Sequence, residues 1–238
     1  MKIEILYQDL CCLYGDKGNT LMLKKCLPEA EFIYTGMNDV PAFLSDEDVA
    51  VCYLCSMSEK SQELVLSRLM PYRETIAAMA KEGKCLFYLV GNALELLGKY
   101  IQREDGSKVE ALGLFDTYAV RQTPNRFNSL MKGTFEGMTV QGFTSRFSHT
   151  YGITEDIALF HIDTGAAMNP DSRLEGIYSG NVLATYMNAP ILVSNPDFAH
   201  WFLRRIGAPL EKLPCEEALR QAYEQRIKDF NRENLEMA

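Results

Sequence analysis

The sequence lacks the features that mark membrane proteins and nucleic-acid-binding proteins. No apolar run approaches the roughly 20 residues needed to span a bilayer. The N-terminal segment carries acidic residues where a signal peptide would need an uninterrupted apolar region. No run of Lys or Arg is longer than a pair, and 24 basic against 32 acidic residues give a net charge of −8. We therefore expect a cytoplasmic protein that binds neither nucleic acid nor a membrane.

The sequence also lacks a convincing disulfide framework or metal site. Its seven cysteines are odd in number and scattered along the chain. Cys52 and Cys55 have the spacing of a redox or zinc half-motif, but they lie in or next to the apolar segment 49–54. That segment is typical of a buried strand, in which residues three apart point to opposite faces. No second Cys or His pair has metal-ligand spacing, so we expect buried thiols, no metal and no cofactor.

What the sequence does contain is an alternation of apolar runs and amphipathic segments. Strands are predicted at residues 2–7, 31–34, 49–54 and 85–90, and helices at 20–27, 61–70, 71–81 and 93–100. Between residues 112 and 150 the segments become short and alternating, which predicts β-hairpins. Further strands are expected at 157–162, 174–178 and 182–186, and a helix at 197–206. This order predicts an α/β fold, with a parallel or mixed sheet covered on both faces and a β-hairpin annex.

The chain shows no repeat, linker or low-complexity tract, so residues 1–238 are predicted to form a single domain. Its last helix is expected at about 214–232. That segment is amphipathic, with one apolar stripe formed by Leu219, Ala222, Tyr223, Ile227 and Phe230. We expect this helix to pack on the sheet or on a partner.

The sharpest candidate site lies where the strand at 85–90 turns into the next helix. Ligand sites of open α/β sheets form at the carboxyl ends of strands. A residue at such an elbow is often forced toward positive φ, which Gly91 can adopt without steric cost. The N-terminus of the following helix would add N–H donors there.

Four motifs, in order, indicate a family. They are YGDKGN at Tyr14–Asn19, LGLFD at Leu112–Asp116, Gly142-Phe143, and TYMNAPIL at Thr185–Leu192 with Asn195-Pro196 after it. In these motifs the chain resembles class I glutamine amidotransferases of the cobyric acid synthase (CobB/CobQ-like) type. It most resembles the GatD-type glutaminase subunits of lipid II isoglutaminyl synthase, which work with a Mur-ligase-like partner of the MurT type. The resemblance covers almost the whole chain and implies a three-layer, flavodoxin-like fold with a mixed, mostly parallel sheet.

At the active positions the chain departs from the family pattern. The resemblance implies that the nucleophilic Cys of Cys-Gly-Gly-x-Gln falls on Gly91, its glycines on Asn92 and Ala93, and its Gln on Glu95. The catalytic His falls on Asn188, and the Arg that holds the substrate carboxylate falls on His149. The Gly-rich oxyanion loop corresponds to Cys55-Ser56-Met57, with Gln62 retained nearby. Glycine offers no sulfur for a thioester, and asparagine accepts no proton near neutral pH.

Three hypotheses follow. The first is a non-hydrolytic subunit, regulatory or structural, beside a Mur-ligase-like enzyme in peptidoglycan precursor amidation. The second is an active glutaminase subunit with an unorthodox nucleophile, for which Cys55 and His149 are the available pair. The third is a module that binds glutamine or a related small molecule at the elbow.

Several of the site residues also have plain structural interpretations. Asp16 and Asn19 are typical turn and helix-cap residues, although a ligand or interface contact there stays open. Glu95 is typical of a solvated helical acid, and His149 of a surface or hydrogen-bonded histidine.

Overall fold

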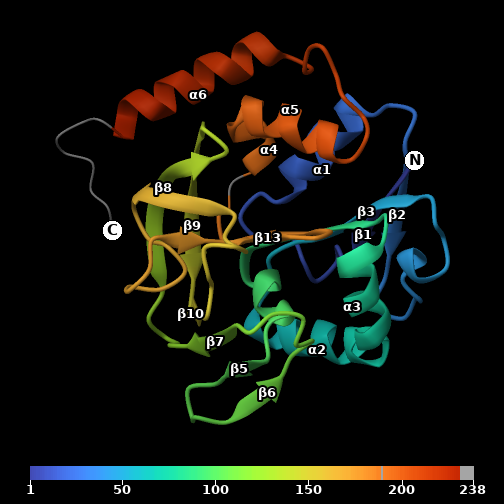
Figure 1. Cartoon of the computed structure of the whole chain (residues 1–238), viewed down its shortest axis with the longest axis vertical. Coiled ribbons are helices and arrows are strands. Elements are labelled where there is room, and N and C mark those ends of the chain that lie inside the picture. Colours follow the sequence, from blue (N-terminus) through green and yellow to red (C-terminus); the bar gives the residue numbers. More distant parts are fainter. Residues whose placement is uncertain (189, 231–238) are drawn as a thin grey trace.

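A six-stranded sheet forms the middle layer of the protein, whose computed structural model describes residues 1–188 and 190–230 (Figure 1). The strand order is β13-β14-β4-β3-β1-β2. The bounds are β1 (Lys2–Leu6), β2 (Glu31–Thr35), β3 (Val49–Leu54), β4 (Leu86–Val90), β13 (Ile177–Ser179) and β14 (Val182–Thr185). All neighbours pair in parallel except β13, which is antiparallel to β14. The continuously apolar β4 is buried along its whole length, as expected for a central parallel strand.

Helices cover both faces of this sheet (Figure 1). One face carries α1 (Lys17–Cys26), α4 (Ile191–Ser194) and α5 (Pro196–Arg205), with α6 (Glu216–Phe230) packed outside them. The other face carries α2 (Glu59–Leu69) and α3 (Arg73–Glu82). Three short segments are 3-10 helices, and they are η1 (Ala42–Leu44), η2 (Met70–Tyr72) and η3 (Gly91–Leu97). The predicted α/β class and three-layer arrangement are therefore confirmed.

The predicted β-hairpin annex consists of two further four-stranded sheets. One has the order β10-β7-β5-β6 and the other β12-β11-β8-β9. Their bounds are β5 (Tyr100–Gln102), β6 (Lys108–Glu110), β7 (Tyr118–Arg121), β8 (Phe127–Phe135), β9 (Met138–Arg146), β10 (Ser148–Tyr151), β11 (Phe160–Thr164) and β12 (Leu174–Glu175). The long hairpin of β8 and β9 turns at Glu136 and Gly137, which both have positive φ. Two such residues in succession form the tight turn that matches the twist of the flanking strands.

The segment after β4 differs from the prediction of a helix at 93–100. It forms the 3-10 helix η3, and β5 already begins at Tyr100. The carbonyl groups at the end of η3 are used by a later segment, because Leu112 N–H donates to Leu96 and Leu114 N–H donates to Leu97. These contacts from a distant part of the chain end the helix early. The first helix also begins three residues earlier than predicted, at Lys17.

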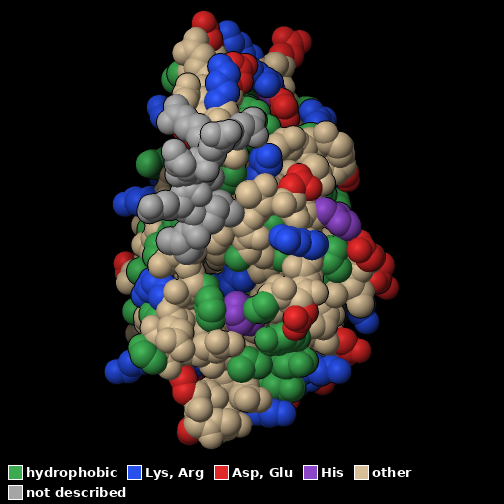
Figure 2. All heavy atoms as spheres, turned by 90° about the vertical axis from the view of Figure 1, so that its left-hand side faces the viewer, with side chains coloured by type: hydrophobic (Ala, Val, Ile, Leu, Met, Phe, Trp, Pro, Cys, Tyr) green, Lys and Arg blue, Asp and Glu red, His purple; other side chains and the backbone are tan. Residues whose placement is uncertain are grey.

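The structure describes the C-terminal helix α6 from Glu216 to Phe230, and residues 231 and 232 of the predicted span lie outside the described residues. Within residues 1–188 and 190–230, no helix has the length and apolar character to cross a bilayer. Figure 2 shows the face formed by the annex, on which charged side chains of both signs are interspersed and apolar side chains gather in the lower half.

Candidate active site

The end of β4 turns sharply at Gly91, which has a φ of +67°. This is the conformation expected at the elbow. A Cβ atom at position 91 would lie 2.5 Å from Cβ of Ser56 and 3.1 Å from Oδ1 of Asn188. Carbon atoms that are not bonded pack at about 3.5–4.0 Å. The elbow therefore has no room for a side chain, whatever its chemistry.

The loop after β3, which the resemblance assigns to the oxyanion hole, has no free backbone donor at its centre. The Ser56 N–H donates to Oδ2 of Asp16 at 3.2 Å, and the Ser56 hydroxyl donates to the same oxygen. The Met57 N–H donates to Oδ1 of Asn92 at 3.0 Å, and the Met57 carbonyl accepts from Nδ2 of Asn92 at 2.8 Å. An oxyanion hole needs such N–H groups aimed at the substrate. Here side chains of the protein occupy both of them.

Asp16 lies at the N-cap position of α1, but its side chain does not cap the helix. It is fully buried and turns inward to Ser56, so the expectation of a helix-capping side chain is wrong for this residue. The reason is the partner: Ser56 presents both an N–H and an O–H to one carboxylate oxygen. Burial raises the pKa of Asp16 to about 6, although the Ser56 hydrogen bonds oppose that rise. Its other oxygen, Oδ1, has no partner among the described residues.

Asn19, in the first turn of α1, also contacts distant parts of the fold. Its Nδ2 donates to the Tyr53 hydroxyl at 2.9 Å, and its Oδ1 accepts from the Leu192 N–H at 3.1 Å. Asn19 therefore joins α1 to the sheet and to α4. The sequence left a structural role and a ligand or interface contact open for Asn19. The structure shows a structural role, because Asn19 forms hydrogen bonds with two other segments of the same chain.

Glu95, on η3, is not a solvated acid. It is buried, and its carboxylate accepts hydrogen bonds from Gln62 Nε2 and from the Tyr186 hydroxyl, both at 2.8 Å. Burial raises its pKa, and the two hydrogen bonds act in the opposite direction. The sequence pattern did not show this, because the short η3 is buried on every side, whereas a longer surface helix would have exposed the residue.

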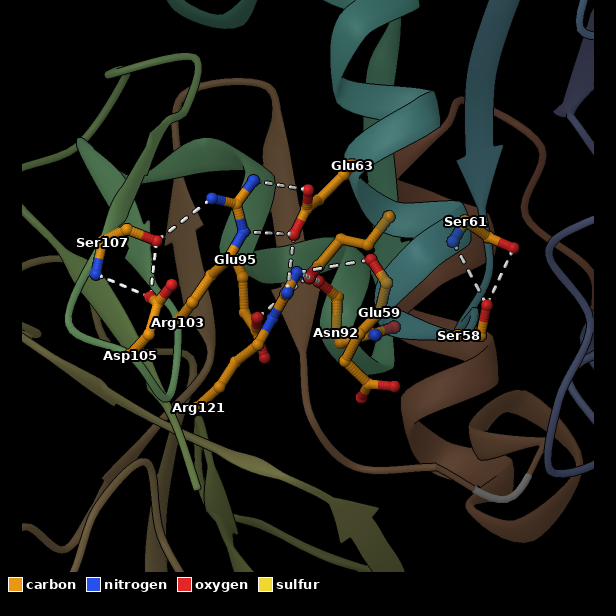
Figure 3. Close-up of polar contacts among 11 residues, drawn as sticks. Ser58, Glu59, Ser61, Glu63, Asn92, Glu95, Arg103, Asp105, Ser107 and Arg121 are labelled. Carbon is orange, nitrogen blue, oxygen red and sulfur yellow. Dashed lines mark hydrogen bonds and ion pairs between the residues drawn. The ribbon is translucent and has the colours of Figure 1, made fainter. Parts of the chain in front are cut away.

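Glu95 is one end of a polar network that fastens the annex to α2 (Figure 3). Arg121, at the end of β7, donates to Oε1 of Gln62 at 2.8 Å and to Oε1 of Glu63 at 2.7 Å. Arg103 donates to both oxygens of Glu63 at 3.0 and 2.7 Å. The Arg103 and Arg121 hydrogen bonds lower the pKa of Glu63 to about 2. The sequence analysis did not predict a role for Arg121. The signal that could have indicated one is its position on the buried side of β7, where an arginine needs polar partners.

Asn188 and His149 both lie in the interior. Asn188 faces the elbow, as the resemblance implies: its N–H donates to the Phe143 carbonyl at 2.7 Å, and its Oδ1 has no partner among the described residues. His149, on β10, is buried rather than on the surface, and its ring centre lies 4.0 Å from that of Phe127. Burial and then the nearby Arg146 lower the pKa of His149 to about 4. An imidazole held neutral in this way is a poor partner for a thiolate.

Cys55, the first residue of the segment that the resemblance assigns to the oxyanion loop, shows no sign of activation. It is buried, and desolvation followed by the charge of Asp16 raises its pKa well above the usual value. No hydrogen bond joins Cys55 to His149 within the part of the chain that the structure describes. The same described part holds no group of three or more His, Cys, Asp or Glu side chains that could bind a metal.

An open hollow of about 330 Å³ lies between the β8–β9 hairpin and the loop that contains Tyr14. Its lining residues are Tyr14, Asn128, Ser129, Leu130, Phe143, Thr144 and Ser145, none of them charged. Phe143 also pairs with Asn188, so the hollow borders the candidate site without opening into the elbow itself. Arg126 donates to the Tyr14 hydroxyl and to Ser145 beside it.

The chain is similar to known proteins in sequence and in fold, although no protein-family model matches it. A curated relative from Streptococcus pneumoniae (strain ATCC BAA-255 / R6) is 27% identical over 229 residues, which cover 94% of this chain and 86% of the relative. A second, from Staphylococcus aureus (strain N315), is 26% identical over 93% of this chain and 92% of its own. Each is the GatD subunit of a glutamine-hydrolysing lipid II isoglutaminyl synthase.

The chain is similar to GatD. The resemblance to GatD-type subunits that the four motifs indicated is therefore confirmed over most of the chain's length. Solved structures agree on the fold. A glutamine amidotransferase crystal structure superposes with a TM-score of 0.55 at 15% identity, covering 86% of this chain and 98% of that one. A glutamine amidotransferase from Thermotoga maritima gives 0.50 at 10% identity, covering 97% and 92%.

Proposed function

We propose that this chain is a cytoplasmic, glutamine amidotransferase-like subunit that does not hydrolyse glutamine and acts beside a Mur-ligase-like protein of the MurT type. The shared process would be the amidation of lipid II or a related peptidoglycan precursor. Similarity to two GatD subunits over more than nine-tenths of the chain supports the subunit role. The geometry of the elbow supports the absence of hydrolysis.

The single observation that carries the second part is the distance of 2.5 Å between a Cβ at position 91 and Cβ of Ser56. Glutamine hydrolysis of this kind needs a sulfur at the elbow that attacks the side-chain amide. Gly91 has no sulfur, and the space for one is occupied. Removing the nucleophile of a catalytic unit in a studied serine protease lowers the rate by about 10⁶-fold.

Two further steps of the reaction also lack a group. Proton transfer needs a base, and the side-chain amide of Asn188, which faces the elbow, is not one. The tetrahedral intermediate needs N–H donors, and those of Ser56 and Met57 are bonded to Asp16 and Asn92. Loss of one oxyanion donor alone costs about 10²–10³-fold in rate. The site therefore lacks the attacking group, the proton acceptor and the donors of the oxyanion loop.

The experiment uses the full chain co-expressed with a MurT-type partner, with lipid II as the acceptor. Ammonium chloride should support amidation by the complex, and glutamine at the same concentration should not. Glutamate release should equal the background without protein. A complex of the Staphylococcus aureus GatD subunit with its own partner serves as the matched positive control.

Glutamate release well above background by the complex would refute the proposal. In that case, labelling with 6-diazo-5-oxo-norleucine and mapping of the adduct would test the alternative of an active subunit. Labelling at Cys55 that a Cys55→Ser variant abolishes would establish that alternative. Failure of the chain to co-purify with any Mur-ligase-like protein would refute the subunit role.

A further inference from the structure

We propose that the Ser56 side chain is the group that closes the elbow, that Asp16 holds it there, and that Gly91 and Ser56 form one steric unit in which neither can change alone. This proposal rests on the proposed function and deepens it, because it names the residue that excludes a nucleophile and a substrate amide from the elbow. Its test depends on stability and not on glutamine chemistry.

Three atoms lie close to the place of a side chain at position 91. A Cβ at position 91 would lie 2.5 Å from Cβ of Ser56, 3.2 Å from Cα of Ser56 and 3.1 Å from Oδ1 of Asn188. The distance of 2.5 Å to Cβ of Ser56 is far too short for two carbon atoms that are not bonded. Removing the Ser56 side chain would leave the 3.2 Å and 3.1 Å contacts, which small shifts can relieve. Ser56 is thus the principal obstacle at the elbow.

Hydrogen bonds keep Ser56 from moving away from the elbow. Asp16 accepts from both its N–H and its hydroxyl, and the hydroxyl also lies 3.3 Å from the Leu13 carbonyl. On the other side, Asn92 makes two hydrogen bonds with the backbone of Met57. All of these groups except the Leu13 residue are buried, and breaking hydrogen bonds of buried groups leaves unsatisfied partners. The loop is therefore held against the elbow from both ends.

A consequence is that a cysteine cannot be restored at position 91 by one substitution. Gly91→Cys in the presence of Ser56 would have to displace a loop that Asp16 and Asn92 fix. Ser56→Gly would have to come first or together with it.

The test is a double-mutant cycle with the substitutions Gly91→Ala and Ser56→Gly. The urea midpoint is followed by the fluorescence of Trp201, the single tryptophan. The matched control is Gly106→Ala, because Gly106 also has a positive φ, +84°, but a Cβ there meets nothing within 4 Å. Both Ala variants carry the same kind of backbone strain, so the difference between them reports the contacts of the added Cβ at position 91, and the Ser56→Gly background then separates the part due to the Ser56 side chain.

We expect Gly91→Ala to lower the midpoint clearly more than Gly106→Ala does. In the Ser56→Gly background, Gly91→Ala should lower the midpoint by little more than Gly106→Ala does, whereas the loss at position 106 should be the same with and without the Ser56 side chain. The single variant Ser56→Gly is measured as the reference, because it loses its own hydrogen bond to Asp16. Should Gly91→Ala fail to fold, a cooperative transition in the double variant is the supporting result. Equal losses at the two glycines, or a loss at Gly91 that is the same with and without the Ser56 side chain, would overturn the proposal.

The two proposals fail separately. Glutamate release by the wild-type complex would refute the proposed function and leave the stability cycle valid. Strictly additive effects in the cycle would refute the closure by Ser56 and leave the amidation assay as it stands.

Discussion

Replacing Asp16 by Asn should change the pH dependence of stability in a defined direction. Burial raises the pKa of Asp16 from 3.8 to about 6 in the folded protein. Because this folded-state value lies above the unfolded-state value, the protonated carboxyl fits the fold better than the carboxylate does. The contribution of Asp16 to stability is therefore fully present below about pH 4 and is lost as the pH rises through about 6.

The magnitude follows from the two pKa values. One pH unit of difference corresponds to 1.36 kcal/mol, so the change from 3.8 to about 6 corresponds to about 3 kcal/mol. The side chain is fully buried, so solvent screening does not reduce this value in the way it does at a surface. The asparagine side chain keeps an oxygen that can accept from Ser56 and does not titrate.

The assay is urea unfolding of the wild type and of Asp16→Asn at intervals from pH 4 to pH 8. The free energy of unfolding of the wild type minus that of the variant should fall by about 2 kcal/mol between pH 4 and pH 7, because the rest of the change of about 3 kcal/mol lies outside this range. Other titrating groups are common to both proteins and cancel in the difference. The variant Asp9→Asn, which removes an exposed carboxylate, is the control for the loss of one negative charge.

A difference that stays flat across this range would show that Asp16 is not the desolvated carboxylate described above. A difference that rises with pH would show that the Ser56 hydrogen bonds outweigh burial. Either result would refute the reasoning.

Two further predictions concern the interior. Glu95→Gln should lower the free energy of unfolding by no more than about 1 kcal/mol, because a glutamine can accept from Gln62 and donate to the Tyr186 hydroxyl. The Tyr186 hydroxyl can then donate its own hydrogen to Oγ1 of Thr150, which lies 2.6 Å away. Glu95→Leu should cost about 3 kcal/mol by leaving these buried groups unpaired; equal urea midpoints for the two variants would contradict the network. Trp201 packs against Phe135, Phe198 and Tyr178 at ring-centre distances of 4.7 to 5.3 Å, so Trp201→Ala should cost about 3 kcal/mol and Trp201→Phe about 1 kcal/mol. Thermal unfolding followed by circular dichroism measures both losses, and an unchanged midpoint for Trp201→Ala would contradict the packing.

The central sheet and the elbow could be predicted from the sequence because local patterns determine them. The continuous apolar run that forms β4 has the signature of a strand buried on both faces, and a glycine directly after it is typical of a turn with positive φ. Alternating apolar and polar residues likewise marked β7 and β9 in the annex. In each of these cases the information lies within about ten neighbouring residues.

The hydrogen bonds of the candidate site could not be predicted in this way. The contact between Asp16 and Ser56 joins residues 40 positions apart, and that between Tyr186 and Glu95 joins residues 91 positions apart. No local pattern indicates that a carboxylate near a helix start will point into the core. The early end of η3 has the same cause, since Leu112 and Leu114 come from a later segment to take its carbonyl groups.

The residues at the elbow are mutually compatible, and this compatibility bears on what the chain can do. A site that lacked only a nucleophile would have open space at position 91 and free N–H groups in the loop. Here Ser56 occupies the space, while Asp16 and Asn92 use the N–H groups of Ser56 and Met57. Each of these contacts stabilises the closed arrangement, so opening it would require several buried hydrogen bonds to break together. These contacts support the proposal that the chain acts beside a partner through its surface and not through chemistry at the elbow.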